Sequence, residues 1–285
     1  MNSCLRNDNA LLYIFIIFLL QFTNYGLENL KWRQSFPEIR KEGVFKTWKA
    51  VYAGNAIAIF TPDRLGTFIG RFSYLKNYSK TKITYTTFVG NYAQLTATLA
   101  FSIAGLVLAW NNNYNFKFPS FLSVPTLLLV FTPITILMLS LFYYQEILTS
   151  ILQKVKWKWA EEIATKLEFV QSYKNLELTL ILLLAFMRYF VFVGQFYLAV
   201  QIFQLPFDFI ETLSFCGIFY LFSTFIPSPF MGNLGTREAV GVFLLSNIDG
   251  ELRLISASLL IWLINVVFPS VLGGFIFLTK KGKAQ

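Results

Sequence analysis

Residues 226–238, IPSPFMGNLGTRE, place two prolines, two glycines and an Arg-Glu pair inside an otherwise apolar part of the chain. Proline lacks a backbone donor and disfavours the helical conformation in the residue before it, so Pro227 and Pro229 are predicted to end a helix. Gly232 and Gly235 permit the backbone conformations of a tight return. The segment therefore predicts a broken helical hairpin.

The returning helix carries groups that bind anions. It is predicted to begin near Thr236, whose hydroxyl can cap it. Its free N–H groups and dipole attract negative charge, and Arg237 adds a full positive charge. Glu238 suits the dipole in the first turn or pairs with an arginine from elsewhere. The alternative is a structural turn with a solvated Arg-Glu pair. Because each charge at membrane depth costs about 2.5–3.5 kcal/mol on insertion scales, a hairpin inside a bilayer favours a functional site.

Arg188 lies in the middle of the apolar segment LILLLAFMRYFVFVGQFYL and has no acid within a helical turn on its own segment. Its guanidinium must face protein or water, and the expected partners are Glu238 or a lipid phosphate. A structural ion pair and a contact with substrate both stay open.

Two more polar side chains are candidates for the same site. Gln94 either bonds between helices or, with Asn91 and Thr98 on the same helical face, lines a polar cavity. Arg64, close to the helix breaker Pro62, is either a cytoplasmic anchor or a phosphate ligand.

The composition indicates which solvent surrounds the chain. Of 285 residues, 55% are hydrophobic, only 14% are charged and 32 are Phe, which is more apolar surface than a soluble domain leaves exposed. The chain has no His, and its two cysteines are Cys4 and Cys216. These residues predict no His or Cys metal site, no His-dependent triad, no disulfide framework and no cofactor.

Five apolar segments reach the length of about 20 residues with which a helix crosses a bilayer. They are residues 10–27, 84–109, 120–143, 176–203 and 254–278. A cleaved signal peptide is the alternative for the first segment. Only Arg6 precedes it and no small-residue cleavage pattern follows, so we interpret it as a span.

Lysine and arginine predict the orientation. The basic loops 28–50, 63–82 and 144–175 are predicted to be cytoplasmic, and Lys31 and Arg71 are counted among their residues. The tail TKKGKAQ is predicted inside, and residues 110–119 and the N-terminus outside, in a bacterial inner membrane. Orientation against an anionic leaflet explains the net charge of +9, so no nucleic-acid partner is expected.

Two segments are too short or too broken to span. VYAGNAIAIFTP, between two cytoplasmic loops, predicts a re-entrant hairpin near 44–66, and residues 209–247 predict a second hairpin that opens to the opposite face. Such inverted interruptions are typical of secondary transporters. The charged and aromatic stretch within 144–175 predicts an amphipathic helix on the cytoplasmic interface, either a linker or a lipid-sensing helix.

These elements predict one all-α polytopic transmembrane domain over residues 1–285. Its expected parts are a first half at 1–109, spans and the interfacial helix at 110–175, and a second half at 176–285.

Three motifs in order resemble a known family. They are TPDRLGTFIGR at 61–71, RYFVFVGQFYL at 188–198, and the proline, Gly-x-x-Gly and Arg-Glu pattern at 227–238. Together they are similar to the transmembrane domain of lysylphosphatidylglycerol synthases and to its stand-alone flippase-like relatives, from about Trp32 to Leu278. The resemblance implies movement of a lipid with a modified head group between leaflets. Because only seven residues follow Leu278, we expect no aminoacyltransferase domain.

One position departs from the family pattern. In the family, Glu usually follows Arg-x-Gly in the first hairpin, whereas Thr67 follows Gly66 here. If that carboxylate balances Arg64 or a cationic head group, this chain prefers a purely anionic head group or has lost activity. A cationic aminoacyl lipid is therefore not the expected cargo.

The expected function is a transporter for an anionic phospholipid or a lipid-linked phosphate such as polyprenyl phosphate. Its binding residues are predicted to be Arg64, Gln94, Arg188, Gly232, Gly235, Arg237 and Glu238. The alternatives are a scaffold subunit of a lipid or glycan biosynthesis complex, and an intramembrane enzyme on lipid phosphate with Glu238 as general base. A homo-oligomer and a partner enzyme both stay open.

Overall fold

The computed structural model describes residues 9–61, 65–144, 173–226, 233–245 and 250–281. Within these ranges the regular elements are all helical. They are α1 (Ala10–Ser35), η1 (Pro37–Lys41), α2 (Val44–Ala58), α3 (Gly66–Tyr74), α4 (Lys80–Asn111), α5 (Val124–Tyr143), α8 (Asn175–Ile202), α9 (Phe209–Phe225), α10 (Thr236–Leu245), α11 (Glu251–Trp262), the π-helical turn η5 (Leu263–Val267) and α12 (Phe268–Lys281). The predicted site residues Arg64 and Gly232, and almost all of the predicted interfacial helix, lie outside the described residues.

Within the described part of the chain, five helical stretches are long and apolar enough to cross a membrane, which confirms the predicted all-α polytopic membrane fold. They are Ala10–Ser35, Lys80–Asn111, Val124–Tyr143, Asn175–Ile202 and the run Glu251–Thr279 through α11, η5 and α12. The first of them continues past the predicted end at residue 27 to Ser35, and this extension carries the charged residues discussed below.

Two of the helices begin at side-chain caps that the sequence supplies. Ser123 accepts a hydrogen bond from the Thr126 N–H at 3.3 Å before α5, and Asp208 accepts one from the Glu211 N–H at 2.7 Å before α9. Each cap satisfies a backbone donor that the first helical turn leaves open.

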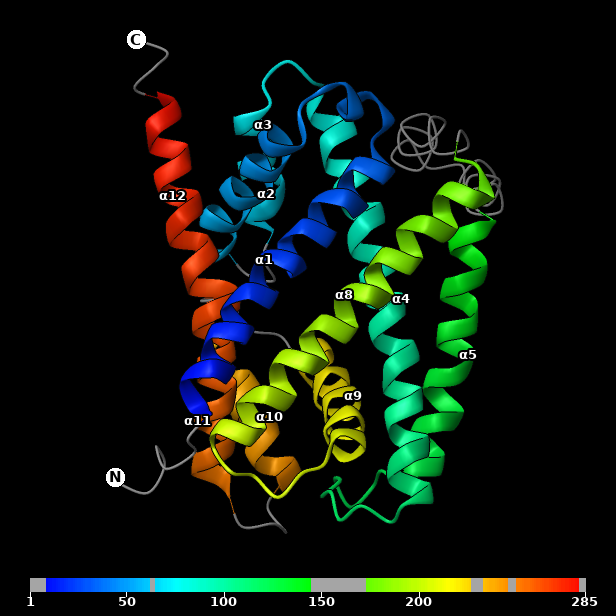
Figure 1. The fold of residues 1–285 in the computed structure, drawn as a ribbon. Coiled ribbons are helices and arrows are strands. Elements are labelled where there is room, and N and C mark those ends of the chain that lie inside the picture. Colours follow the sequence, from blue (N-terminus) through cyan, green and yellow to red (C-terminus); the bar gives the residue numbers. More distant parts are fainter. Residues whose placement is uncertain (1–8, 62–64, 145–172, 227–232, 246–249, 282–285) are drawn as a thin grey trace.

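Two helical hairpins enter the bundle from opposite ends (Figure 1). One is α2 and α3, and it extends to Tyr74 rather than ending near residue 66 as predicted. The other is α9 and α10, whose second helix begins at Thr236 as predicted. Glycines let these helices approach closely, since a Cβ added at Gly70 would lie 2.3 Å from the Ala53 carbonyl oxygen.

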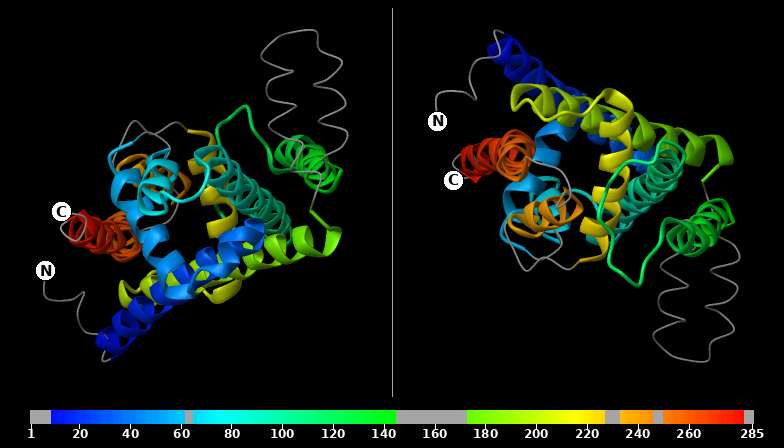
Figure 2. Two further views of the ribbon diagram at one scale, coloured as in Figure 1. Left: turned by 90° about the horizontal axis from the view of Figure 1, so that it is seen from above. Right: turned by 90° about the horizontal axis from the view of Figure 1, so that it is seen from below.

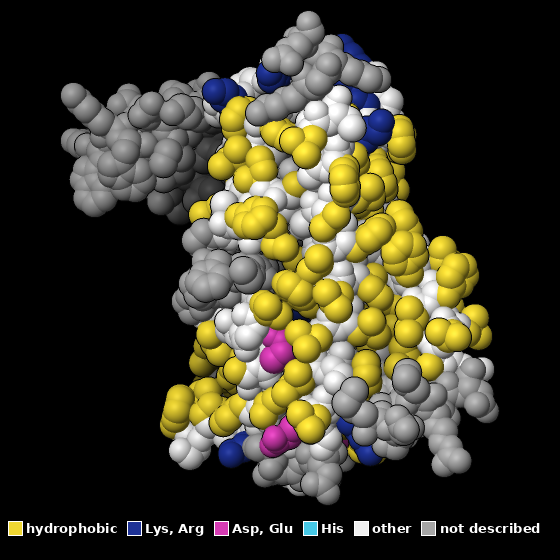
Figure 3. All heavy atoms as spheres, turned by 90° about the vertical axis from the view of Figure 1, so that its left-hand side faces the viewer, with side chains coloured by type: hydrophobic (Ala, Val, Ile, Leu, Met, Phe, Trp, Pro, Cys, Tyr) yellow, Lys and Arg dark blue, Asp and Glu magenta, His cyan; other side chains and the backbone are white. Residues whose placement is uncertain are grey.

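Long-range packing sets the shape of the bundle. α1 packs along α8, α4 along α9, and α12 along α2, as the views down the bundle show (Figure 2). α5 lies at the rim, where Leu129 is 76% exposed. Lysine and arginine lie mainly at the upper end of the molecule, with some at the lower end, and hydrophobic side chains cover most of the face between the two ends (Figure 3). This distribution suits a protein whose sides contact lipid.

Candidate functional site

A carboxylate is buried where α1, α3 and α8 meet. Glu28 Oε2 lies 2.7 Å from Lys31 Nζ and 2.8 Å from Arg188 Nη1, and its Oε1 lies 2.7 Å from Arg71 Nη2. Glu28 is 6% exposed, Lys31 0% and Arg71 2%. We call these four residues the Glu28 cluster. In it, one carboxylate faces three cations.

The cluster corrects two predictions. Lys31 and Arg71 were expected in cytoplasmic loops, which is wrong, because both are buried in helices of the bundle. A buried cation needs a counter-charge and good hydrogen bonds to offset its lost hydration, and Glu28 supplies both. The spacing of Glu28 and Lys31, three residues apart on one helical face, was the available sequence signal.

Arg188 joins the cluster to a chain of amides. Its Nε donates to Asn24 Oδ1 at 2.6 Å, and Asn24 Nδ2 lies 3.5 Å from Asn265 Oδ1. Asn265 and Gln195 exchange two hydrogen bonds, at 3.0 and 3.3 Å. Asn265 belongs to the π-helical turn η5, a rare form that often marks functional sites. The sequence analysis did not identify Asn24, Gln195 or Asn265.

Gln94 takes the first of its two predicted roles. Its Oε1 accepts hydrogen bonds from Lys31 Nζ at 3.3 Å and Arg188 Nη1 at 3.4 Å, and its Nε2 donates to the Ala185 carbonyl at 3.3 Å. The side chain thus bonds between α1, α4 and α8. Gln94 therefore lies next to the Glu28 cluster and bonds two of its members.

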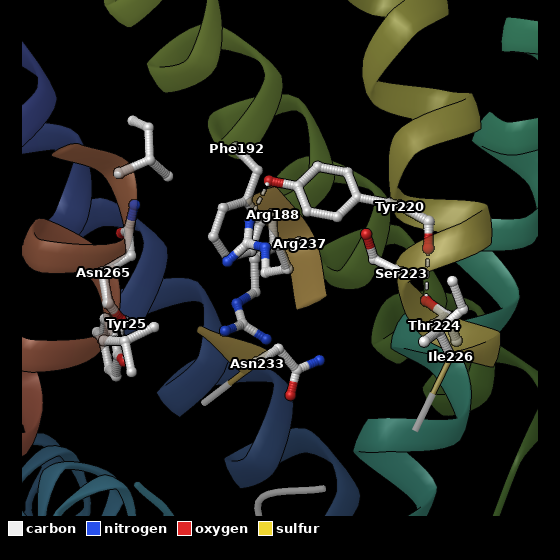
Figure 4. A pocket seen from close by; sticks show the side chains of 12 residues that line it. Tyr25, Arg188, Phe192, Tyr220, Ser223, Thr224, Ile226, Asn233, Arg237 and Asn265 are labelled. Carbon is white, nitrogen blue, oxygen red and sulfur yellow. Dashed lines mark hydrogen bonds between the residues drawn. The ribbon is translucent and has the colours of Figure 1, made fainter. Parts of the chain in front are cut away.

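A cavity of about 300 Å³ lies beside the cluster and brings Arg188 and Arg237 together. Both arginine side chains occupy its middle, with Tyr25 and Asn265 on one side and Tyr220 and Ser223 on the other (Figure 4). The two predicted arginines therefore share one site, although they come from different helices.

Arg237 is held by aromatic rings. Its Nη2 donates to the Tyr220 hydroxyl at 3.2 Å, and its guanidinium lies over the rings of Tyr220 and Phe219 at 5.3 and 5.7 Å. Among the described residues its buried Nε has no hydrogen-bond partner, and no carboxylate pairs with it. Ser223 Oγ, on a residue 5% exposed, is also without a partner there. Because buried polar groups are normally bonded, these atoms mark a place for a ligand or water.

Glu238 is not the carboxylate of Arg188, contrary to one predicted pairing. It accepts hydrogen bonds from the Gly235 N–H and Ser258 Oγ, both at 2.7 Å, and so closes the first turn of α10. Gly235 has φ +84°, a conformation that favours glycine. Gly235 and Glu238 shape the hairpin. Arg237, which lies between them in the sequence, lines the cavity.

Sequence comparison assigns the family. The family model described as Lysylphosphatidylglycerol synthase TM region matches residues 4–273. The chain belongs to this family. No curated protein and no solved structure matches the chain.

In this family member a second pocket lies on the opposite face of α9. It measures about 220 Å³ and is lined mainly by apolar side chains of α5 and α9, including Phe131, Phe222 and Phe225. One helix thus separates a polar cavity from an apolar pocket. Across the described ranges, no group of three or more His, Cys, Asp or Glu residues is placed to hold a metal ion.

Proposed function

We propose that the chain moves an anionic lipid head group between leaflets through the cavity that Arg188 and Arg237 share. One observation carries the proposal. Two guanidinium groups border one cavity inside the bundle, and only Arg188 has a carboxylate partner within the described part of the chain.

The charge distribution favours an anion as the ligand. Ionised groups at membrane depth are costly unless they are paired or lie in a wet cavity, and such groups usually mark a substrate path. A phosphate diester supplies one negative charge and oxygen acceptors that match the planar fork of arginine. Ser223 and Tyr220 add hydroxyl groups on the facing wall.

The helices around the cavity support a transport path. Hairpins that enter from opposite ends are the arrangement in which two halves of a transporter rock about a central site. The lipid tail stays in hydrocarbon, and the apolar pocket between α5 and α9 offers it a neighbouring surface. The lysine-rich end is the cytoplasmic one in this proposal, with the C-terminus inside and the N-terminus outside an inner membrane.

The enzyme and the scaffold remain alternatives to be tested. Glu238 is the carboxylate that an intramembrane enzyme would use, but two hydrogen bonds occupy it and it shapes a turn. A scaffold would need partner binding without lipid exchange. No described feature favours either alternative over a transporter.

Lipid exchange in reconstituted vesicles tests the proposal. Tail-labelled phosphatidylglycerol is expected to cross to the other leaflet, and zwitterionic phosphatidylcholine to cross more slowly. Arg237→Gln and Arg188→Gln are each expected to slow exchange of the anionic lipid at least tenfold, or about 1.4 kcal/mol.

Arg253→Gln is the matched control, because that guanidinium is exposed and, within the described residues, donates to the Gln204 carbonyl at 2.8 Å. It is expected to exchange lipid at the wild-type rate. Wild-type rates in both Arg188→Gln and Arg237→Gln would contradict the proposal. Chemically converted lipid in the vesicles would favour the enzyme instead.

A further inference from the structure

Arg188 is the member of the Glu28 cluster that also borders the cavity. Its side chain is 13% exposed, against 0% for Lys31 and 2% for Arg71. Its Nη1 bonds Glu28, while its guanidinium also lies 5.4 Å from the Phe192 ring on the cavity wall. A ligand in the cavity therefore meets a cation that is already paired.

Glu28 can release Arg188 without becoming unpaired. If the 2.8 Å contact to Arg188 is lost, the contacts to Lys31 and Arg71 remain, both at 2.7 Å. Removing the sole partner of a buried charge is strongly destabilising, about 3–5 kcal/mol, but this carboxylate keeps two partners.

Arg188 also keeps other hydrogen-bond partners when a ligand replaces Glu28 as its anionic partner. Its Nε remains bonded to Asn24 Oδ1 at 2.6 Å, on the edge that does not contact Glu28. Gln94 Oε1 lies 3.4 Å from Nη1 and can accept from it. The guanidinium can thus change its anionic partner with little movement of the side chain.

From these contacts we infer that Glu28 competes with the phosphate of the lipid head group for Arg188. Glu28 is a positioning residue in this inference, which rests on the proposed function. Arg237 binds the entering phosphate, which then takes Arg188 from Glu28, and the return of Glu28 to Arg188 releases the head group. The competition keeps binding weak enough for turnover and selects head groups whose negative charge is not cancelled by an attached amine.

Two substitutions in the Glu28 cluster should change the affinity for an anionic head group in opposite directions. Glu28→Gln removes the competing charge and keeps the shape, so anionic head groups should bind more tightly and leave more slowly. Lys31→Met removes one of the cations that compete with Arg188 for the Glu28 carboxylate. Glu28 should then bind Arg188 more strongly, and the head group should bind more weakly. A cluster that only stabilises the fold gives no reason for opposite signs.

The affinity test uses short-chain dihexanoyl phosphatidylglycerol, with dihexanoyl phosphatidylcholine as the zwitterionic control. Calorimetric titration of the full chain in detergent is expected to show about tenfold tighter binding of the anionic probe to Glu28→Gln, or about 1.4 kcal/mol, and severalfold weaker binding to Lys31→Met. The double variant Glu28→Gln with Arg188→Gln should lose the gain. Vesicle exchange by Glu28→Gln should be slower than wild type.

Each other outcome has a definite meaning. Unchanged or weaker anion binding by folded Glu28→Gln overturns the inference, as does a gain that survives Arg188→Gln. If Glu28→Gln does not fold, tighter or unchanged binding by Lys31→Met overturns it. Wild-type chain that exchanges no anionic lipid contradicts the proposed function itself, whereas wild-type exchange with equal affinities in all variants contradicts the inference alone.

Discussion

Arg71 illustrates what a guanidinium provides at a buried site. It donates from Nη2 to Glu28 Oε1 at 2.7 Å and from Nη1 to Thr87 Oγ1 at 3.2 Å, and it lies 4.6 Å from the Trp32 ring. Lysine keeps the charge but has a single compact ammonium, which cannot reach both acceptors. Arg71→Lys should therefore lower the free energy of unfolding by about 1–3 kcal/mol, measured by tryptophan fluorescence during denaturation in detergent.

Lys82→Arg is the control for this substitution. Lys82 Nζ pairs with Glu38 Oε1 at 2.5 Å on the surface, where the lysine side chain is 40% exposed. Exposed pairs contribute little, so the change should stay within about 0.5 kcal/mol. Equal stability of the Arg71→Lys variant and the wild type would show that the two hydrogen bonds of the Arg71 guanidinium are not needed for stability.

Substitution of Ser223 should affect lipid exchange and protein stability differently. Its buried hydroxyl has no partner within the described residues, so Ser223→Ala should leave the free energy of unfolding unchanged or raise it by up to about 1 kcal/mol. If the hydroxyl contacts the head group, vesicle exchange of anionic lipid should fall severalfold.

Ser214→Ala is the matched control on the same helix and should show the reverse pattern. Ser214 Oγ donates to the Gly105 carbonyl at 2.7 Å between α9 and α4. Its loss should cost about 1 kcal/mol of stability and leave exchange unchanged in the folded fraction. Unchanged lipid exchange by Ser223→Ala would show that the Ser223 hydroxyl does not contact the head group.

At the scale of elements, the contact of α4 with α9 places the polar wall of the cavity. A Cβ added at Gly217 would lie 2.6 Å from the Phe101 carbonyl oxygen, a backbone atom that cannot rotate away. Gly217→Ala must therefore push the helices apart, and we expect a loss of about 1–3 kcal/mol in thermal unfolding experiments.

Gly194→Ala in α8 is the corresponding control, since nothing lies within 4 Å of its added Cβ. Alanine is the better helix former, so this variant should be as stable as wild type or more stable by about 0.5–1 kcal/mol. Similar losses in both variants would indicate that close packing at Gly217 is not the cause.

The helices could be predicted much better than the site that they form. Long apolar runs and helix breakers identify spans such as Lys80–Asn111 and the return at Thr236 without any knowledge of packing. The end of α1 was misjudged, because Lys31 resembles a residue that ends a span. It is buried because of contacts with other helices, and Arg71 is likewise placed by a carboxylate 43 residues away in the chain.

At the scale of the whole molecule, the site depends on helices that the sequence keeps far apart. Glu28, Arg188 and Arg237 come from α1, α8 and α10, and Asn265 comes from a π-helical turn that hydrophobicity does not reveal. Sequence could propose that Arg188 and Arg237 meet, since both are charges in apolar surroundings. It could not predict Glu28 as the partner of Arg188, because a carboxylate near a span end is usually solvated.

The orientation of the bundle decides the direction in which the two hairpins open, and surface labelling can test it. α1 and α4 end at opposite ends of the bundle (Figure 1). Lys41, in η1 after α1, and Asn112, directly after α4, are both exposed. In a chain with Cys4→Ser and Cys216→Ala, a membrane-impermeant maleimide applied to intact spheroplasts should label Asn112→Cys. It should label Lys41→Cys only after permeabilisation, because the lysine-rich end is expected to remain in the cytoplasm. The reverse pattern would place α9 and α10 on the cytoplasmic side, so a head group entering from the cytoplasm would reach the cavity by way of that hairpin first.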